Sequence, residues 1–422
     1  MEAKADSQGR TEMRGILTVL FIVGVAVTGG LILRSGQPDA ERLEQLRQEV
    51  KERKARAVAP VTPAPQAIWP MYRHDRGLLG RTGEALETPL ALRWSFKTGG
   101  PVKSSAAVLG DRVYVGSNDN HLYALELSTG REIWKFKTGG AVESSPLLLK
   151  GRVYFGSEDG KLYALEAADG KLAWSFETQG KVLGAPNYAP RLDIPGEWVV
   201  FGSYDNSVYA VDALTGKEGW RCEMNNYING APAVAGEHVV FGDCDGKLSN
   251  VSLRNGAVER QVEVGAPIAA SPAVLGERAY FGHYGNEFVC ADLKTGQRVW
   301  TYKDEDFPYF SSPAVGGNRV VFGGRDKRLH ALNLESGERQ WVFATRGRVD
   351  SAPVITGDGK VVVGSNDGRL YVVGLETGSE VWSYEIGDSI SASPAVVAGC
   401  VIVGSEDGSV YAFGPERKEA RP

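Results

Sequence analysis

From about residue 91 onward, short runs of β-branched, aromatic and other apolar residues are separated by turns rich in glycine and aspartate. In the clearest stretch, Val153–Phe155 and Leu162–Leu165 are β-prone runs on either side of Asp159–Gly160. Asp-Gly pairs tolerate the positive φ angles of a type I′ hairpin turn, so these runs are predicted to be antiparallel neighbours. No helix-length periodicity interrupts this part of the chain.

Two more runs complete the unit. Leu172–Thr178 follows a second turn at Asp169–Gly170, and Ser145–Leu149 precedes the first hairpin as an innermost strand. Four short strands joined by three tight turns are typical of one β-propeller blade. The unit repeats with a period of about 40 residues, within the range known for propeller blades. Its first turn occurs eight times, beginning at Gly116, Gly156, Gly202, Gly242, Gly282, Gly323, Gly364 and Gly404.

A tryptophan recurs on the outermost strand of the repeat, and only the copy at Arg260 lacks it. One large flat side chain at a fixed place in each blade favours packing between adjacent sheets, so we interpret these residues as structural. They are Trp94, Trp134, Trp174, Trp220, Trp300, Trp341 and Trp382.

The two ends of the repeat array are complementary. The last copy ends at Tyr411–Phe413 without a tryptophan strand, and the first tryptophan strand, Leu92–Thr98, has no inner strands before it. Pairing these segments would close the ring and remove its exposed edges. The sequence therefore predicts an all-β, eight-bladed propeller over residues 67–422.

The first 66 residues have a different character. After a short tail at 1–14, residues 15–33 form an uncharged run long enough for a helix to cross a bilayer. A cleaved signal peptide with a site near Ala26 and Thr28 is the competing interpretation, but Leu31–Leu33 extend the apolar run and favour a retained transmembrane anchor. Basic residues flank the run on both sides, so charge alone does not set its orientation.

Residues 34–66 are predicted to be a charged helical stalk followed by a proline-rich spacer. Leu43, Leu46 and Val50 could form a short coiled-coil stripe, although so short a stripe favours a solvated helix. Val58–Gln66 is typical of a stiff linker.

Composition narrows the range of partners and cofactors. The net charge is −5, and residues 67–422 are more acidic than the N-terminal segment, which argues against a nucleic-acid partner, since such a partner requires a basic stripe. The four cysteines, Cys222, Cys244, Cys290 and Cys400, include no CxxC and no adjacent pair. A disulfide framework and a cysteine zinc site are therefore not expected.

The element ALEAADGKLAW at Ala164–Trp174, with counterparts such as ALNLESGERQW at Ala331–Trp341, resembles the tryptophan-docking motif of PQQ-like (quinoprotein-type) propellers. Ile68–Arg73 also resembles the WPM(F/Y)R opening found before many of them. The resemblance covers about residues 67–414. It implies either a dehydrogenase that holds pyrroloquinoline quinone and calcium in the central funnel, or a member of the non-catalytic branch that includes BamB. The fold alone does not choose between them.

The residues favour the non-catalytic branch. The adjacent cysteines that many quinoprotein enzymes of this type place against the quinone are missing, and CxxCH is absent. The five histidines lie in separate segments without metal-ligand spacing. Although Gly242–Gly246 (GDCDG) resembles a calcium loop, its recurrence in nearly every blade identifies a hairpin turn. No catalytic residue, cofactor or metal is therefore predicted, with quinone and calcium as the alternative.

Positions that vary between blades are the candidates for function. The position three residues before the inner-strand proline is expected to line the funnel mouth, as a ring of mixed charge that does not favour a tight divalent-cation site. Its polar and aromatic members are Lys103, Glu143, Asn229, Phe310, Asp350 and Ser391. A wet funnel wall without function is the alternative to a ligand site there.

A second set of departures runs from the insertion at Asn187–Pro195 to Arg328, where aromatic residues lie next to charges. Such residues are typical of protein-recognition surfaces, although ordinary loop variation is the alternative. The candidates are Asn225, Asn226, Tyr227, His283, Tyr284, Phe307, Tyr309, Phe310, Arg325, Lys327 and Arg328.

These observations predict a non-catalytic interaction scaffold that is anchored in the inner membrane and displays its propeller in the periplasm. By resemblance to BamB it is expected to have protein partners, and a role in outer-membrane protein assembly is one possibility. The alternatives are a quinone-dependent dehydrogenase and a funnel that binds a small ligand or glycan.

Overall fold

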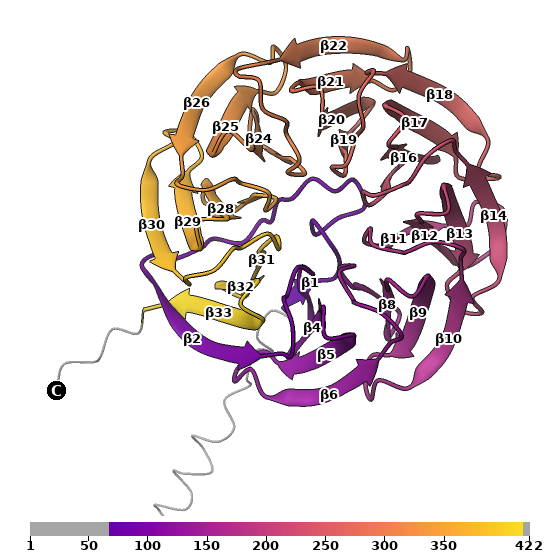
Figure 1. Cartoon of the computed structure of the whole chain (residues 1–422), viewed down its shortest axis with the longest axis horizontal. Coiled ribbons are helices and arrows are strands. Elements are labelled where there is room, and N and C mark those ends of the chain that lie inside the picture. Colours follow the sequence, from indigo (N-terminus) through magenta and orange to yellow (C-terminus); the bar gives the residue numbers. More distant parts are fainter. Residues whose placement is uncertain (1–66, 417–422) are drawn as a thin grey trace, which may run out of the picture. The chain divides into compact units, whose positions relative to one another are not determined.

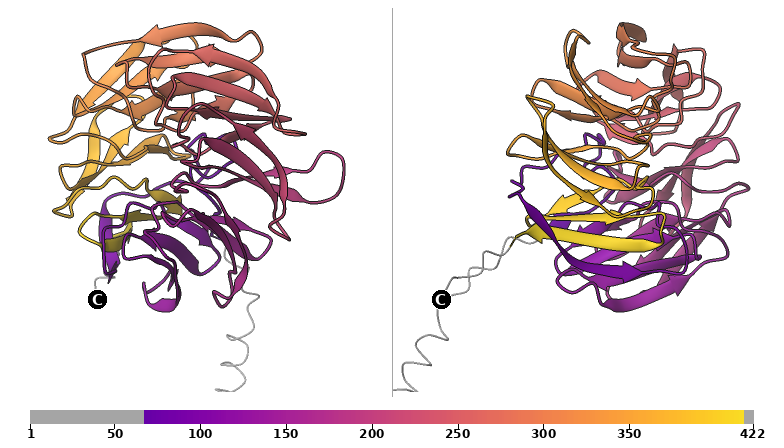
Figure 2. Two further views of the ribbon diagram at one scale, coloured as in Figure 1. Left: turned by 45° about the vertical axis from the view of Figure 1, so that its right-hand side comes forward. Right: turned by 60° about the vertical axis from the view of Figure 1, so that its left-hand side comes forward.

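The computed structural model describes residues 67–416, and these form a ring of eight β-sheets around a central axis (Figure 1). Each sheet has four antiparallel strands, which in blades 1–7 run in sequence order from the centre to the rim, and blade 1 carries one additional short strand. Figure 2 shows the same ring from two further directions. The predicted all-β, eight-bladed propeller is therefore confirmed.

The strands of blades 1–4 are β3 (Ala107–Leu109), β4 (Arg112–Ser117), β5 (His121–Glu126) and β6 (Glu132–Lys137); β7 (Leu147–Leu149), β8 (Arg152–Gly156), β9 (Lys161–Glu166) and β10 (Leu172–Glu177); β11 (Asn187–Pro190), β12 (Glu197–Gly202), β13 (Ser207–Asp212) and β14 (Glu218–Glu223); β15 (Ala233–Ala235), β16 (His238–Gly242), β17 (Lys247–Ser252) and β18 (Val258–Glu263). Those of blades 5–7 are β19 (Ala273–Leu275), β20 (Arg278–Gly282), β21 (Phe288–Asp292) and β22 (Gln297–Tyr302); β23 (Ala314–Gly316), β24 (Arg319–Gly323), β25 (Arg328–Asn333) and β26 (Arg339–Ala344); β27 (Val354–Ile355), β28 (Lys360–Gly364), β29 (Arg369–Gly374) and β30 (Glu380–Glu385).

Blade 8 joins the two ends of the propeller. Its inner strands are β31 (Ala395–Val397), β32 (Cys400–Gly404) and β33 (Ser409–Pro415), and its outer strand is β2 (Leu90–Lys97). Trp94 pairs with Ala412 and Ser95 with Tyr411. The closure predicted from the two unpaired segments is confirmed, and it leaves no radial gap in the ring.

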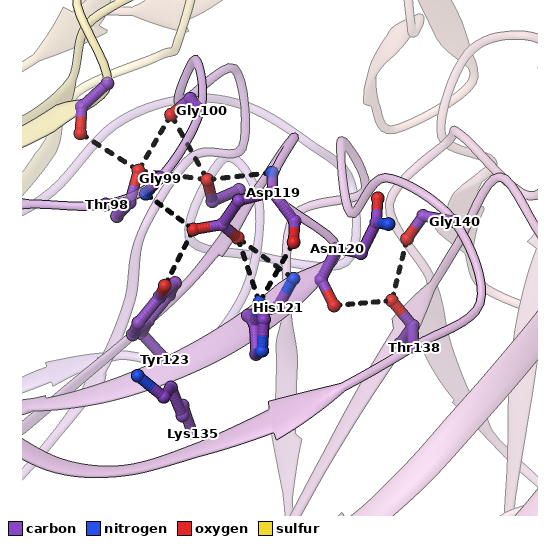
Figure 3. Close-up of polar contacts among 12 residues, drawn as sticks. Thr98, Gly99, Gly100, Asp119, Asn120, His121, Tyr123, Lys135, Thr138 and Gly140 are labelled. Carbon is purple, nitrogen blue, oxygen red and sulfur yellow. Dashed lines mark hydrogen bonds and ion pairs between the residues drawn. The ribbon is translucent and has the colours of Figure 1, made fainter.

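The recurring turn is held by its own aspartate. In blade 1, Asp119 accepts hydrogen bonds from the Gly99 amide (2.6 Å), the His121 amide (3.1 Å) and the Tyr123 hydroxyl (2.7 Å; Figure 3). Since Gly99 follows the outer strand of the preceding blade, this bond also links two blades, and Asp159, Asp205 and Asp367 accept the equivalent bond in blades 2, 3 and 7. The carboxylate is thus satisfied by protein donors, which accounts for the repeated aspartate without a bound ion.

The turn type differs from the predicted type I′. Type I′ requires positive φ at both central residues, but in the turn of blade 2 only Gly160 has positive φ (+81°), and Asp159 does not. The Gly160 amide instead donates to the Ser157 carbonyl (3.2 Å), and Ser157 donates to Lys161 (3.0 Å). In this conformation the Asp159 carboxylate accepts from the Lys161 amide (3.1 Å) and the Tyr163 hydroxyl (2.7 Å).

The outer-strand tryptophans dock between blades. A β-bulge next to the tryptophan, or at the equivalent position in blade 4, occurs in every outer strand and redirects the side chain towards the next blade. There the indole N–H donates to a backbone carbonyl, as in the 2.7 Å bond from Trp341 to Leu375. Five further tryptophans make the same bond at 2.8–3.3 Å: Trp94, Trp134, Trp174, Trp220 and Trp300. Trp382, the seventh of the predicted set, instead packs edge-on against Phe413 of blade 8, with ring centroids 5.7 Å apart.

Residues 67–84 form a strap that closes one end of the ring. β1 (Ile68–Trp69) pairs with β3, and the chain then crosses the middle of the ring (Figure 1). Main-chain hydrogen bonds link it to the inner strands of five more blades, through the amides of Leu148, Val234, Val274, Val315 and Ile355. Side-chain bonds by Asn187 and Glu84 add blades 3 and 8. The segment that resembles a family opening is therefore a floor that touches every blade.

Arg73 anchors this strap. Its side chain is 1 % exposed, and its guanidinium donates to the carbonyls of Pro353 and Pro313, both at 2.6 Å. Burial lowers the pKa of Arg73 to about 10, so the group remains charged at neutral pH. Because burying a charge is costly unless the charged group is hydrogen-bonded, the two bonds to backbone carbonyls offset the burial of Arg73.

The predicted tail, anchor and stalk, at residues 1–14, 15–33 and 34–66, lie outside the described residues. Within residues 67–416 no helix is long and apolar enough to cross a membrane.

Candidate functional site at the mouth of the central channel

The channel inside the ring ends in a cavity of about 190 Å³, with Tyr72 of the strap among its lining residues. The hydroxyl of Tyr72 donates to Ser312 Oγ (3.1 Å). Inner-strand serines form interblade bonds around the cavity, such as that from the Ser105 amide to Ser145 Oγ (3.0 Å). Of the eight ring positions predicted from the repeat, seven line this cavity: Lys103, Leu183, Asn229, Ala269, Phe310, Asp350 and Ser391.

The charged members of the ring are paired within the protein. Lys103 Nζ lies 2.9 Å from Glu143 Oε1, which also accepts from Asn118 (2.8 Å). The hydrogen bond to Glu143 raises the pKa of Lys103. Asp350 accepts from Arg325 Nε at 3.1 Å. A small anionic or cationic ligand would have to displace these partners, and the ring offers no free cluster of carboxylates.

A second ring surrounds the first. It consists of the residue two places after the glycine that opens each hairpin, and it meets the first ring across the blade boundary. Tyr204 donates to Asn229 (2.6 Å), and Tyr284 packs edge-on against Phe310 with ring centroids 4.2 Å apart. Arg325, from the same position of blade 6, lies 3.8 Å from the centroid of Phe310. Two variable positions therefore combine at each of these contacts.

The aromatic side chains of these contacts lie on one face of blades 3–6, and Phe307 lies in the loop that leads to Phe310. We call these five residues the aromatic patch: Tyr204, Tyr227, Tyr284, Phe307 and Phe310. Tyr204 and Tyr227 are stacked, with centroids 5.1 Å apart and planes 9° apart. Tyr227 is 50 % exposed, Tyr284 48 % and Phe307 45 %. Because rigid, half-exposed rings lose little entropy when they are covered, such a patch is suited to contact with another macromolecule.

The flanking polar candidates lie in the same loops. Asn225 and Asn226 precede Tyr227, and Asn226 Oδ1 accepts from the Tyr227 amide (2.9 Å). Lys327 is exposed at a turn position with a φ of +65°. Arg328 is paired with Glu305 at 2.6 Å, so the acidic loop offsets much of this predicted basic turn.

Two predicted contact residues are buried, and this part of the prediction is wrong. Tyr309 is 1 % exposed because it packs edge-on against Phe322 (5.1 Å between centroids) in the core of blades 5 and 6. His283 is also 1 % exposed, and its Nδ1 accepts from the Gly285 amide (3.0 Å) inside the hairpin. Burial lowers the pKa of His283, which favours the neutral imidazole.

The insertion in blade 3 lies away from the patch. It joins β11 to β12, whereas the aromatic residues follow β12 and β14 at the opposite end of these antiparallel strands. Arg191 of the insertion stacks on Trp198 (4.4 Å to the ring) and forms an ion pair with Asp212. The predicted surface from Asn187 to Arg328 is therefore divided between two faces.

Among residues 67–416, one group of three metal-ligating side chains is close enough to share an ion: Asp304, Asp326 and His330, with ligand atoms within 4.8 Å. These atoms already have partners. His330 bonds to Asp326 (2.8 Å) where other blades place a tyrosine on the turn aspartate, and Asp304 contacts Arg339 (3.1 Å). Calcium requires six to eight oxygen ligands, so this group does not resemble a calcium site.

Sequence reasoning missed Tyr204 and Tyr72. Tyr204 occupies the same variable hairpin position as Tyr284, which was selected, so comparison of that position across all blades would have identified it. Tyr72 belongs to the strap, and its place in the channel follows from tertiary packing rather than from the repeat.

The family model for the outer membrane protein assembly factor BamB matches residues 85–204 and 325–419, about half of the chain. The chain belongs to the PQQ-like repeat β-propeller family. The two matched ranges are the ends that meet at the closure, and the unmatched part between them carries most of the aromatic patch. No curated protein sequence matches this PQQ-like propeller at a significant level.

Solved structures share the fold at low sequence identity. BamB from Moraxella catarrhalis has a TM-score of 0.66 and 18 % identity, covering 79 % of this chain and 100 % of that protein. A computationally designed protein, Ika8, has a TM-score of 0.67 and 18 % identity over 75 % of this chain and 97 % of its own. The quinohemoprotein alcohol dehydrogenase of Comamonas testosteroni has a TM-score of 0.69 and 15 % identity over 86 % and 83 %. Neighbours thus include enzymes and BamB.

Proposed function

We propose that this PQQ-like propeller is a non-catalytic scaffold that binds a protein partner through the aromatic patch. The observation that carries the proposal is the pair of ring contacts, Tyr204–Tyr227 and Tyr284–Phe310, that hold exposed aromatic faces rigid at the channel mouth. At the boundary between blades 4 and 5, which lies between these two contacts, the hairpin position is Cys244 and the ring position is Ala269, both small. Rigid aromatic residues beside such a shallow surface are typical of protein-binding hot spots.

The test uses the full-length chain with Tyr227, Tyr284 and Phe307 replaced by serine. Each of these side chains is half exposed, so the triple variant is expected to keep the wild-type unfolding transition. Recovery of the crosslinked partner should fall at least tenfold, in line with the loss of a few hot-spot side chains. Leu214→Ser is the matched control, because Leu214 is 70 % exposed on the turn between β13 and β14, at the opposite face. Unchanged recovery with the triple variant would refute the proposal.

A photo-crosslinking residue at position 284 then identifies the partner, with position 214 as the control site. The finer proposal, which the matched family model supports, is a role in outer-membrane protein assembly. In that case the adduct at 284 contains a component of the machinery that assembles outer-membrane proteins. An unrelated envelope protein in the adduct would leave the scaffold in place and reject the assembly role.

The proposal includes the location. The uncharged run at residues 15–33 supports a retained inner-membrane anchor, with the propeller in the periplasm. Resistance of the full-length chain to alkaline carbonate extraction, lost when residues 15–33 are deleted, tests the anchor. A phosphatase fusion after residue 422 that is active only in the periplasm tests the orientation.

The quinone-dependent alternative deserves a direct test because dehydrogenases are among the structural neighbours. The described residues do not fit quinone with calcium at the channel mouth, since Glu143 and Asp350 are each held by internal donors and provide no oxygen-rich ligand set. Full-length protein titrated with pyrroloquinoline quinone and calcium should therefore show no thermal shift. A ligand at a hundredfold its Kd would add about 2.7 kcal/mol of stability, so a clear shift would favour the enzyme.

A further inference from the structure

Blade 4 lacks the interblade tryptophan, but blade 5 keeps the glycine and the carbonyl that would contact its indole ring. In six other blade boundaries the indole lies against a positive-φ glycine and donates to the carbonyl three residues earlier. Blade 5 keeps both elements, Gly296 with a φ of +74° and the Leu293 carbonyl. A Cβ built on Gly296 would have only Gln261 O at 3.5 Å and Cδ of the Arg260 side chain at 3.8 Å as neighbours, so the arginine stem lies where the indole is missing. At the other six glycines a ring atom lies within 2.5–2.7 Å.

At the blade 2–3 boundary, where Trp174 is present, a cleft of about 330 Å³ has no lining residue from the outer strand. Between blades 4 and 5 a cleft of about 340 Å³ is lined by Leu293 and Lys294, next to the turn that holds Gly296, and it reaches the outer strand at Glu259 and Arg260. We call it the blade 4–5 cleft, and the residues that matter for its chemistry are His238, Asn250, Glu259, Arg260, Glu277 and Leu293. Arg260, which stands in place of the tryptophan, is exposed and forms no ion pair within the described part of the chain. Within residues 67–416 no side chain donates to the Leu293 carbonyl, the equivalent of the six indole acceptors.

The cleft also contains an acceptor without a donor. Asn250 is 6 % exposed, and its Oδ1 is buried without a hydrogen-bond partner. It pairs with Arg260 across β17 and β18, at a register where five other blades have alanine opposite the outer strand. A buried amide oxygen without a donor is destabilising by roughly 1–3 kcal/mol. Its presence in place of alanine is explained if a ligand supplies the missing N–H.

We propose that the blade 4–5 cleft binds an indole group that comes from outside the chain. A planar ring would take the place of the Arg260 stem on Gly296, as the resident indoles lie on their glycines, and its N–H would donate to Leu293 or Asn250. The chain itself cannot supply the ring from its ends, because all nine tryptophans lie between Trp69 and Trp382. The charges of Glu259, Arg260 and Glu277 at the opening suit the polar group that carries the ring, which is either a peptide main chain or a free amino acid.

This site is independent of the aromatic patch. The residues of the cleft lie by the β15–β16 and β19–β20 turns, at the opposite end of the strands from the hairpins that bear Cys244 and Tyr284. Failure of one proposal therefore leaves the other untouched.

The experiment measures binding of 5-fluoroindole and of N-acetyl-5-fluorotryptophan amide to the full-length chain by ¹⁹F NMR line broadening, since the protein's own tryptophans give no ¹⁹F signal. Arg260→Trp fills the cleft with a resident indole and should abolish binding. Asn250→Ala restores the residue common at this register and should weaken binding about tenfold, the equivalent of one hydrogen bond to a buried acceptor. Val381→Trp, which adds an indole at an exposed position on β30, is the control and should bind like wild type.

The sources of the ring are separated by the two probes. Binding of the amide at least as tightly as the free indole indicates a tryptophan side chain of a polypeptide, and binding of 5-fluoroindole alone indicates a small molecule. The proposal is overturned if the wild-type chain broadens neither probe at millimolar concentration. Equal broadening by wild type and a folded Arg260→Trp variant would overturn it as well, because the probes would then bind elsewhere.

Discussion

The contact between an interblade indole and its glycine can be tested by adding one methyl group to the glycine. A Cβ on Gly378 would lie 2.7 Å from Cγ and Cδ2 of Trp341, a distance that real Cβ atoms do not tolerate. The indole cannot move away freely, since its N–H is bonded to Leu375 at 2.7 Å and its ring is buried. Gly378→Ala should therefore loosen the boundary between blades 6 and 7.

The magnitude follows from two separate effects. Gly378 has a φ of +66°, and an L-residue with a Cβ in this region is destabilised by roughly 1–2 kcal/mol. Displacing a packed side chain adds about 1–3 kcal/mol. Gly296→Ala is the matched control: its φ of +74° imposes the same backbone strain, but its nearest neighbour would be 3.5 Å away. The difference between the two variants isolates the contact with the ring, at about 1–3 kcal/mol.

Urea unfolding of both variants, followed by far-UV circular dichroism, gives this difference. With an m-value of about 3 kcal/mol/M, the midpoint of Gly378→Ala should lie about 0.3–1 M below that of Gly296→Ala. Unequal slopes would show that the blades unfold in steps, and the comparison would then use hydrogen exchange at the two boundaries. If both variants lose the same stability, the indole is not seated on the glycine and the reasoning fails, together with its use for the blade 4–5 cleft.

Three further predictions concern buried polar groups. Arg73→Ala leaves the carbonyls of Pro313 and Pro353 without donors and should reduce the free energy of unfolding by about 3–5 kcal/mol. Backbone amides of the strap should then exchange early with solvent, and full protection of these amides would contradict the anchoring role of Arg73. Burial raises the pKa of Asp243, so its ionised form destabilises the fold above the folded-state pKa. Asp243→Ser should therefore stabilise the protein at pH 7, by an amount that shrinks as the pH falls through that pKa. A gain in stability that is equal at pH 4 and pH 7 would exclude this cause. Burial raises the pKa of Cys290 to about 12, and this thiol should react with a thiol reagent at pH 7 only on unfolding; rapid labelling of the folded protein would show that β21 opens locally.

The architecture could be predicted because each blade repeats the same pattern of strands and turns. The spacing of the glycine turns gave the number of blades, and the strands left unpaired at Leu92–Thr98 and Tyr411–Phe413 gave the closure that the structure shows. The missing tryptophan at Arg260 was also visible in the sequence. The blade 4–5 cleft could not be predicted from the sequence, since it depends on how closely the two neighbouring blades pack without the tryptophan.

The candidate site was predicted less well, for physical reasons. A loop such as Asp304–Phe310 has no periodicity, so nothing in the sequence shows that Tyr309 turns inward while Phe307 stays exposed. The insertion at Asn187–Pro195 was grouped with the wrong face, although counting turns along antiparallel strands places it at the other end. The strap offered only a family resemblance, because its contacts join residues far apart in the sequence, such as Arg73 and Pro353.

The strap and the closing strand also set an order on synthesis. Within the propeller, a ribosome releases residues 67–97 before the rest, yet β2 cannot pair until Ser409–Pro415 is made. The amide of Ile355 that bonds to Gly80 likewise emerges about 275 residues after Gly80. The earliest part of the propeller to leave the exit tunnel is therefore the last to find its place. A chain that ends before β33 can form every contact of the strap but leaves β2 without a partner. Such fragments should be degraded by proteases rather than persist as smaller propellers.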